Sequence, residues 1–273
     1  MSSRLRLDRE LVRRGLAASR EEAQAAITEG RVTVGGAPAA KATRLVSPAE
    51  PVEVSPGGAR FASRGGEKLE HALEAFDVAV AGRACIDLGA STGGFTDCLL
   101  QRDAAEVFSI DVGYGQLHPK LRADPRVHVA ERTNLRALPA DLAVQLHALR
   151  GEHPLVVADL SFISLRTVAA DIVDLMGDAG EAVVLVKPQF EAGRQVVSRG
   201  KGVVRDPADH LAAILAAGEA FEDAGCLVQG VVRSPLRGPA GNVEFLLYLR
   251  RTGEAARWQD DAEREAAREA DDG

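Results

Sequence analysis

Short β-prone apolar runs recur along the middle of the chain, and turns and stretches with helical spacing of apolar residues separate them. The runs cover residues 84–88, 106–110, 126–131, 155–158, 182–186 and 242–249. Strands of this length that alternate with helices are typical of a mostly parallel sheet. We therefore predict an α/β, Rossmann-like domain, and we expect its last strand to be antiparallel.

The first 54 residues have a different pattern, which predicts a small α+β unit. Leu7 and Leu11 lie one helical turn apart, and a capping box at 19–22 begins a second helix that ends at Gly30. Residues 31–36 and 51–54 alternate like half-buried strands.

Composition shifts place the domain boundaries. The Pro- and Gly-containing stretch 55–58 predicts a linker. We thus expect an N-terminal unit with its linker over 1–58 and a larger domain over 59–253. The acidic tail over 254–273 is expected to form a frayed, solvated helix.

The most informative motif begins within the strand at 84–88 and reads Asp-Leu-Gly-Ala-Ser-Thr-Gly-Gly-Phe from Asp87 to Phe95. Its glycines allow a ligand to approach the backbone closely. Ser91 stands where a dinucleotide-binding loop needs its second glycine, and Asp87 favours a cationic, amine-bearing ligand over a phosphate. S-adenosyl-L-methionine is such a ligand. The predicted contacts from this loop are Asp87, Gly89, Ser91, Gly93, Gly94 and Phe95.

Polar residues at the ends of the following strands also indicate a nucleoside ligand. Asp111 follows the strand at 106–110, and we expect its carboxylate to accept the ribose hydroxyls of an adenosine beside Val112. Asn134 follows the third strand and is expected to reach the adenine or its ribose. Asp159 follows the fourth strand at the same edge of the sheet.

Composition argues against several classes of protein. The chain has 273 residues, of which 46% are hydrophobic, and this suits one large domain plus a small one. Its three cysteines lack zinc-site spacing, and their odd number argues against a disulfide framework. We therefore expect no metal and a cytoplasmic location. The apolar run at 182–186 is far too short to span a membrane, so we expect no membrane partner, and we expect a monomer.

Charge is divided unevenly along the chain, although the net charge is -7. Residues 1–64 contain eleven Arg and Lys against seven Asp and Glu, whereas the tail contains eight acids against three arginines. A basic unit on an acidic chain predicts contact with nucleic-acid phosphates. The expected RNA contacts are Arg4, Arg6, Arg13, Arg14, Arg20, Arg31, Lys41 and Arg44 in this unit, together with Arg205 and Arg237 from two loops.

The N-terminal unit resembles the S-four RNA-binding domain, a fold that a ribosomal small-subunit protein shares with many pseudouridine synthases. The resemblance covers about residues 4–54. It rests on Arg-Leu-Asp at 6–8, Leu-Val-Arg-Arg-Gly-Leu at 11–16 and Gly-Arg-Val-Thr-Val-Gly-Gly at 30–36. It implies that this unit binds RNA.

Four charged residues at one edge of the predicted sheet extend the resemblance. Lys68 lies near the start of a helix, and Glu244 lies near the start of the last strand. Asp159 and Lys187 follow the fourth and fifth strands. This Lys-Asp-Lys-Glu set is similar to that of the FtsJ-like RNA ribose 2′-O-methyltransferases. With Val-Lys-Pro-Gln-Phe-Glu at 186–191 and the S-four unit, it makes the chain resemble the TlyA (haemolysin A) family over nearly its whole length.

The resemblance implies a class I methyltransferase fold with seven strands, S-adenosyl-L-methionine as cofactor, and 2′-O-methylation of a cytidine in ribosomal RNA within ribosomal subunits. Lys187 would remove the hydroxyl proton, aided by the nearby charge of Lys68, or would only orient the oxygen. Asp159 would orient the lysine and the methyl group, and Glu244 would hold Lys68 or the ribose. Two alternatives remain: a membrane-active haemolysin, and a nicotinamide-dependent Rossmann enzyme, which needs a glycine at Ser91.

Overall fold

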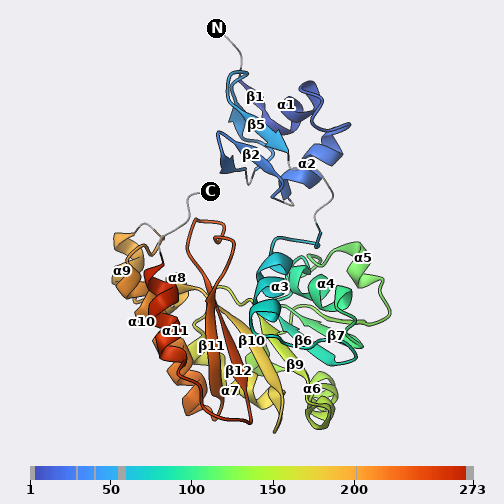
Figure 1. The fold of residues 1–273 in the computed structure, drawn as a ribbon. Helices are drawn as coiled ribbons and strands as arrows, with labels where there is room; N and C mark the ends of the chain where they lie inside the picture. The colour runs from blue at the N-terminus through green and yellow to red at the C-terminus, as the bar shows by residue number, and fades with distance from the viewer. Residues whose placement is uncertain (1–3, 29, 40, 55–59, 201, 269–273) are drawn as a thin grey trace. The chain divides into compact units, whose positions relative to one another are not determined.

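A computed structural model describes residues 4–28, 30–39, 41–54, 60–200 and 202–268. The chain divides into two compact units, Met1–Arg64 and Gly65–Gly273 (Figure 1). The predicted linker at 55–58 and the predicted boundary after residue 58 lie outside the described residues.

The N-terminal unit is the small α+β structure that the sequence predicts. Helices α1 (Leu7–Arg13) and α2 (Arg20–Thr28) pack against each other. The predicted cap forms, because Ser19 Oγ accepts the Glu22 N–H at 3.1 Å, and the Glu22 carboxylate accepts the N–H of Ala18, the residue before the cap, at 2.6 Å. The strands are β1 (Leu5–Arg6) paired with β4 (Leu45–Val46), and β2 (Val32–Val34) between β3 (Ala37–Pro38) and β5 (Val52–Val54).

The larger unit is built on a seven-stranded sheet with the order β11-β12-β10-β9-β6-β7-β8. The last strand, β12, runs antiparallel to both of its neighbours, β10 and β11, and the other pairs in the sheet are parallel. The predicted mostly parallel sheet with an antiparallel last strand is thus confirmed. The sequence located every strand except β11. Their bounds are β6 (Ala84–Leu88), β7 (Glu106–Ile110), β8 (Val127–Ala130), β9 (Leu155–Ala158), β10 (Glu181–Val186), β11 (Leu227–Arg233) and β12 (Phe245–Arg250).

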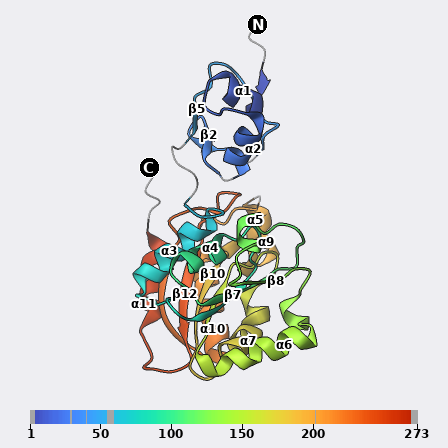
Figure 2. The same cartoon turned by 90° about the vertical axis from the view of Figure 1, so that its right-hand side faces the viewer.

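Helices cover both faces of this sheet, and Figure 2 shows α6, α7 and α10 on the side away from α3 and α4. Alternate residues of β6 divide between the two sides, since Ile86 and Leu88 join the core beneath α7 and α10, whereas Asp87 meets Thr96 of α4. The main helices are α3 (Gly65–Ala75), α4 (Gly94–Gln101), α6 (Ala140–Ala148), α7 (Leu165–Met176) and α10 (Pro207–Asp223). Shorter ones are α5 (Pro119–Arg122), α8 (Pro188–Glu191) and α9 (Arg194–Arg199), with 3-10 turns at Leu135–Ala137 and Leu149–Glu152.

The acidic tail is not a frayed helix, and this prediction is wrong over the described residues. Helix α11 (Trp258–Ala267) packs against α10 and β11. Trp258 is 1% exposed, and its indole N–H donates to Glu222 Oε1 at 2.8 Å. Trp258, Ala262 and Ala266 are spaced one turn apart and all join the core, so the helix is amphipathic despite its acidic composition.

The described residues contain no helix with both the length and the apolar character that a bilayer-crossing helix needs.

Candidate active site

A cavity of about 430 Å³ opens at the carboxyl ends of β6, β7 and β9. This volume lies within the range of small-ligand sites, and the edge is the one where open α/β sheets bind ligands. Six of the ten residues predicted to contact the cofactor line it: Gly89, Ser91, Asp111, Val112, Asn134 and Asp159.

Two of these residues show why the cavity has its shape. Gly89 has a φ of +86°, and a Cβ there would stand 2.6 Å from the Asp159 carbonyl oxygen, so only glycine allows β6 and β9 to converge. The Asp111 carboxylate accepts the Ser91 N–H at 2.8 Å and the Gly113 N–H at 2.6 Å. Each Asp111 oxygen keeps lone-pair capacity for a ribose hydroxyl, so this end of the cavity fits an adenosine.

The other four predicted contacts do not line this cavity. Asp87 is fully buried, and its Oδ2 accepts the Thr96 hydroxyl at 2.6 Å. Burial raises the pKa of Asp87 to about 7. Gly93 has a φ of +97°, and a Cβ there would stand 2.2 Å from Leu121 Cδ1, so this glycine leaves room for the Leu121 side chain. Gly94 and Phe95 are buried in the first turn of α4.

Lys187 and Asp159 form an ion pair beside the cavity. Lys187 directly follows β10, and its Nζ lies 2.5 Å from Asp159 Oδ1. The same ammonium donates to Ser161 Oγ at 2.8 Å and lies 5.9 Å from the centre of the Phe190 ring. Since Asp159 also lines the cavity, this residue connects the ligand site to the lysine.

Lys68 and Glu244 form a second, more deeply buried ion pair. The two pairs lie at the same edge of the sheet, because Val186 of β10 pairs with Phe245 of β12, next to Lys187 and Glu244. The four residues therefore gather as two pairs. The expected help from Lys68 in deprotonating Lys187 is not supported, since Glu244 matches the Lys68 charge.

The sequence interpretation missed two residues of the site, Ser161 and Phe162. Phe162 is 93% exposed, has a φ of +65°, and lies 5.4 Å from Phe190 between ring centres. A non-glycine residue in the left-handed region carries backbone strain, and an exposed aromatic ring gains nothing from burial. Both features cost free energy, and such costs point to function. Their position directly after Asp159, in Asp-Leu-Ser-Phe, was the available signal.

In the N-terminal unit, four of the eight predicted phosphate contacts are arginines that pair with two buried carboxylates. Asp8 pairs with Arg6 and Arg20, and Glu10 pairs with Arg13 and Arg14. Both carboxylates are 0% exposed. Hydrogen bonding from Arg13, with further help from Arg14, lowers the pKa of Glu10 to about 2.

Arg14, which the sequence predicts as a phosphate contact, is engaged by hydrogen bonds within the N-terminal unit. Besides Glu10, its guanidinium donates to the carbonyl oxygens of Glu50, Ser47 and Pro48. Its side chain is only 19% exposed. The remaining predicted contacts are less enclosed: Arg4 and Lys41 are exposed, while Arg31 and Arg44 are half-buried.

Comparison with known proteins agrees with this geometry. Residues 61–251 match the FtsJ-like methyltransferase family, and residues 5–52 match the S4 domain, the S-four domain named above. The chain is 50% identical to the 16S/23S rRNA (cytidine-2′-O)-methyltransferase TlyA of Mycobacterium tuberculosis, over 92% of this chain and 91% of the relative. It is 44% identical to the Bacillus subtilis protein YqxC, over 98% of this chain and 93% of that one.

A solved structure from Streptococcus thermophilus that carries a hemolysin name superposes with a TM-score of 0.73 at 35% identity, covering 98% of this chain and 96% of that chain. The predicted fold and family are thus confirmed. The chain belongs to the FtsJ-like methyltransferases that carry an N-terminal S4 domain, the family of the TlyA proteins.

Proposed function

We propose that this protein transfers a methyl group from S-adenosyl-L-methionine to the ribose 2′-oxygen of a cytidine in ribosomal RNA. One observation supports this most strongly: Asp159 lines the ligand cavity and also pairs with Lys187. A methyl donor in the cavity would therefore lie next to the lysine that handles the acceptor oxygen. The 50% identity to the Mycobacterium tuberculosis enzyme supports cytidine in rRNA as the substrate.

The described cavity fits the cofactor at its adenosine end. Asp111 and Asn134 would hold the ribose and adenine, and Gly89 would leave room for the chain that leads to the sulfonium. When bound, S-adenosyl-L-methionine supplies a methyl group on a good leaving group, so the protein needs mainly to position the hydroxyl and accept its proton.

Lys187 is the residue we assign to the 2′-hydroxyl. The new bond joins the 2′-oxygen to the methyl carbon, the bond from that carbon to sulfur breaks, and the hydroxyl proton leaves. Only the neutral amine can take that proton, and the Lys187 side chain is held in an ion pair with Asp159. Proton removal by Lys187 thus requires this pair to loosen when RNA enters.

The other site residues would hold the nucleotide. The buried Lys68–Glu244 pair presents a fixed arrangement of charge beside the acceptor. The rings of Phe162 and Phe190 provide aromatic faces on which a base taken out of its stack can lie. The S4 domain would dock on rRNA through its basic residues.

The decisive experiment uses the purified full-length protein, labelled S-adenosyl-L-methionine, and small and large ribosomal subunits that lack the modification. The expected result is label in rRNA that maps to the 2′-oxygen of a cytidine. The Lys187→Ala protein is the matched control and should label the RNA at a rate that is lower by roughly 10²-fold or more. Label on a base, or no transfer to either subunit, would refute the proposal.

A further inference from the structure

Ser161 lies at the junction between the cofactor cavity and Lys187. It is exposed, and it lines the cavity of about 430 Å³ together with Asp159. Its Oγ accepts a hydrogen bond from Lys187 Nζ at 2.8 Å. Ser161 therefore links the space for the methyl donor to the lysine that we assign to the 2′-hydroxyl.

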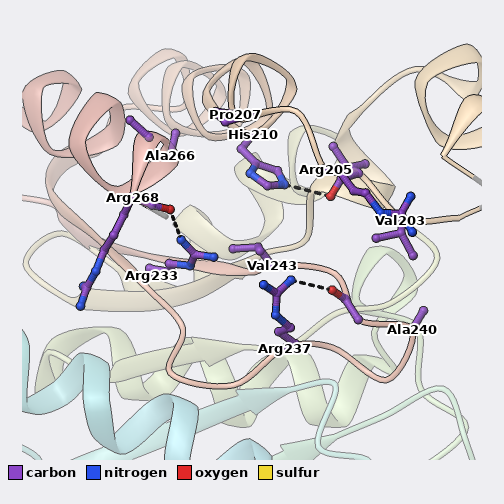
Figure 3. Close-up of a pocket in the computed structure, with 13 residues that line it drawn as sticks. Val203, Arg205, Pro207, His210, Arg233, Arg237, Ala240, Val243, Ala266 and Arg268 are labelled. Carbon is purple, nitrogen blue, oxygen red and sulfur yellow. Dashed lines mark hydrogen bonds between the residues drawn. The ribbon is translucent and has the colours of Figure 1, made fainter. Parts of the chain in front are cut away.

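A second cavity, of about 480 Å³, has no such connection to the lysine. Residues from the start of α10, the end of β11 and the end of α11 line it, among them Pro207, His210 and Arg233 (Figure 3). Its described lining includes neither Ser161 nor Lys187. The Ser161 hydroxyl thus belongs to the cofactor side of the catalytic residues.

The loop between β9 and α7 carries Ser161, and hydrogen bonds anchor this loop at both ends. At its start, the Asp159 N–H donates to a carbonyl oxygen of β6 at 2.9 Å. At its end, the Glu191 carboxylate accepts the Ser164 hydroxyl at 2.5 Å and the N–H of the next residue at 2.7 Å. Glu191 lies in α8, the helix that directly follows Lys187. The loop and the lysine are therefore held in register with each other.

Ser161 and Asp159 hold the Lys187 ammonium in different ways. Nζ lies 2.5 Å from Asp159 Oδ1, but this oxygen has no hydrogen-bond partner among the residues that the structure describes. The attraction at Asp159 is therefore one between charges, which depends on distance rather than on direction. The contact with Ser161 is a hydrogen bond, which also constrains direction. Ser161 thus constrains the orientation of the amino group.

The two partners also differ once Lys187 has lost a proton. The neutral amine has no charge for the Asp159 carboxylate to attract. A hydroxyl oxygen, in contrast, accepts a hydrogen bond from an ammonium and from a neutral amine alike. Only the neutral amine can take the proton of the 2′-hydroxyl. The Ser161 hydroxyl is therefore a partner that is available to both forms of the lysine, including the form that reacts.

We propose that Ser161 is a positioning residue for the methyl transfer, and that its hydroxyl holds Lys187 Nζ in the orientation in which the amine meets the ribose 2′-hydroxyl. The proposal rests on the proposed function, because it concerns the same lysine. In the reaction, the hydroxyl proton passes to Nζ as the 2′-oxygen takes the methyl group, and Ser161 itself gives up no proton. Loss of the Ser161 hydroxyl should therefore lower turnover and spare the binding of both substrates.

The kinetic test compares full-length Ser161→Ala and Ser161→Thr with wild type. Ser161→Ala should lower kcat by about tenfold, with KM for S-adenosyl-L-methionine and for the ribosomal subunits within about twofold of wild type. Ser161→Thr keeps a hydroxyl and should restore kcat to within about threefold of wild type. Thr252→Ala is the matched control for loss of a hydroxyl and should keep the wild-type kcat. Thr252 is exposed and follows the end of β12 that pairs with the start of β10, whereas Lys187 follows the other end of β10.

A second measurement detects the contact without methyl transfer. The chain contains five lysines, so selective ¹⁵N labelling of lysine gives few side-chain signals, and Lys187→Ala identifies that of Lys187. Ser161→Ala should quicken the exchange of the Lys187 amino hydrogens with water by about fivefold, the factor for one ordinary hydrogen bond. Ser161→Thr should keep the slow exchange. The Lys68 signal should not change in either variant, because Lys68 pairs with Glu244.

Several results would overturn the proposal. A normal kcat for Ser161→Ala would show that the hydroxyl is not needed, and an equal loss of kcat in Ser161→Ala and Ser161→Thr would indicate packing rather than hydrogen bonding. A loss confined to KM for S-adenosyl-L-methionine would make Ser161 a cofactor contact instead. Unchanged exchange at Lys187 in Ser161→Ala would also contradict the proposal. Absence of methyl transfer by the wild type would contradict the proposed function, and the exchange rates alone would then decide whether Ser161 holds Lys187.

Discussion

The N-terminal unit and the catalytic domain both bury carboxylates, but they give them different partners. In the N-terminal unit, Asp8 and Glu10 are surrounded by arginines. In the catalytic domain, the buried Glu244 and the half-buried Asp159 pair with lysines. Arginine keeps its charge at any working pH and fixes geometry, whereas lysine can give up a proton. The difference separates ion pairs that hold a fold from ion pairs that can take part in a reaction.

Asp87 extends the comparison, because its hydrogen-bonding partner is a hydroxyl rather than a cation. Hydrogen bonding from Arg13 lowers the pKa of Glu10, and hydrogen bonding from Arg6 lowers that of Asp8. Burial raises the pKa of Asp87, and the Thr96 hydroxyl offsets this only in part. Full burial alone therefore does not decide the direction of the shift. The presence of a cationic partner decides it.

The largest effect is expected at Lys187. Lys187→Ala should lower turnover by roughly 10²-fold or more, the scale of lost general-base or positioning catalysis, with S-adenosyl-L-methionine affinity near normal. If lysine is needed because it can release a proton, Lys187→Arg should be equally impaired. Single-turnover methyl transfer to ribosomal subunits measures both.

Lys120→Ala is the control for this prediction, because Lys120 is an exposed lysine on α5. It should keep the wild-type rate. A near-normal rate for Lys187→Arg would show that Lys187 is not the base. It would also mean that the lysine pairs and the arginine pairs do not differ in the way proposed here.

The next effect is expected at Asp111, a carboxylate whose partners are backbone N–H groups. Asp111→Ala leaves those donors and the ribose hydroxyls without an acceptor, so cofactor binding should weaken by roughly 2–3 kcal/mol. Calorimetry with S-adenosyl-L-methionine gives the loss directly. Asp178→Ala removes an exposed carboxylate and should bind normally. Wild-type affinity for the Asp111 variant would place the adenosine end of the site elsewhere.

The difference between Asp87 and the arginine-paired carboxylates predicts how the stability of the catalytic domain depends on pH. Because its folded pKa is raised, its contribution is fully present below pH about 4 and is lost as pH rises through about 7. Between pH 5 and 7 the free energy of unfolding should fall by about 2 kcal/mol from this group, and Asp87→Asn should remove that fall. Urea unfolding followed by the fluorescence of Trp258, the only tryptophan, reports on this domain alone. The same pH slope in both proteins would contradict the assignment.

The sequence predicted the parts of the fold that depend on apolar patterning. The runs at 84–88, 106–110 and 155–158 coincide with β6, β7 and β9, since strands buried on both faces are mostly apolar. The sequence prediction failed at α11, because the many acidic residues of this helix obscured the apolar stripe that begins at Trp258.

The residues of the candidate site were predicted only in part. Positions that follow from strand topology were predictable, and contacts that depend on helix packing were not. Strand ends brought Asp111, Asp159 and Lys187 to one edge, as parallel topology requires. The face on which Asp87 lies follows from strand alternation, but the fact that this face meets Thr96 depends on how α4 packs. The pairing of Glu10 with Arg13 and Arg14 was visible as helical spacing, but the burial of Glu10 was not.

The smallest effect tests the arginine pairs themselves. Glu10→Gln keeps the shape of the side chain but removes its charge. The cost should be about 1 kcal/mol, because Arg13 is half exposed and Arg14 retains carbonyl acceptors. Amide hydrogen exchange in α1 and α2 should then quicken about fivefold, while the fluorescence-monitored unfolding of the catalytic domain stays unchanged.

Acid should also affect the two regions in opposite directions. The lowered pKa of Glu10 means that its stabilisation is present above pH about 4.5 and is lost as pH falls toward 2, the reverse of the direction at Asp87. Glu10→Gln should therefore flatten the acid dependence of exchange in the N-terminal unit. Glu53→Gln, at an exposed position of β5, should not. Equal protection in wild type and Glu10→Gln across this range would mean that the buried pairs add no net stability, and that arginine in this unit is retained for RNA rather than for the fold.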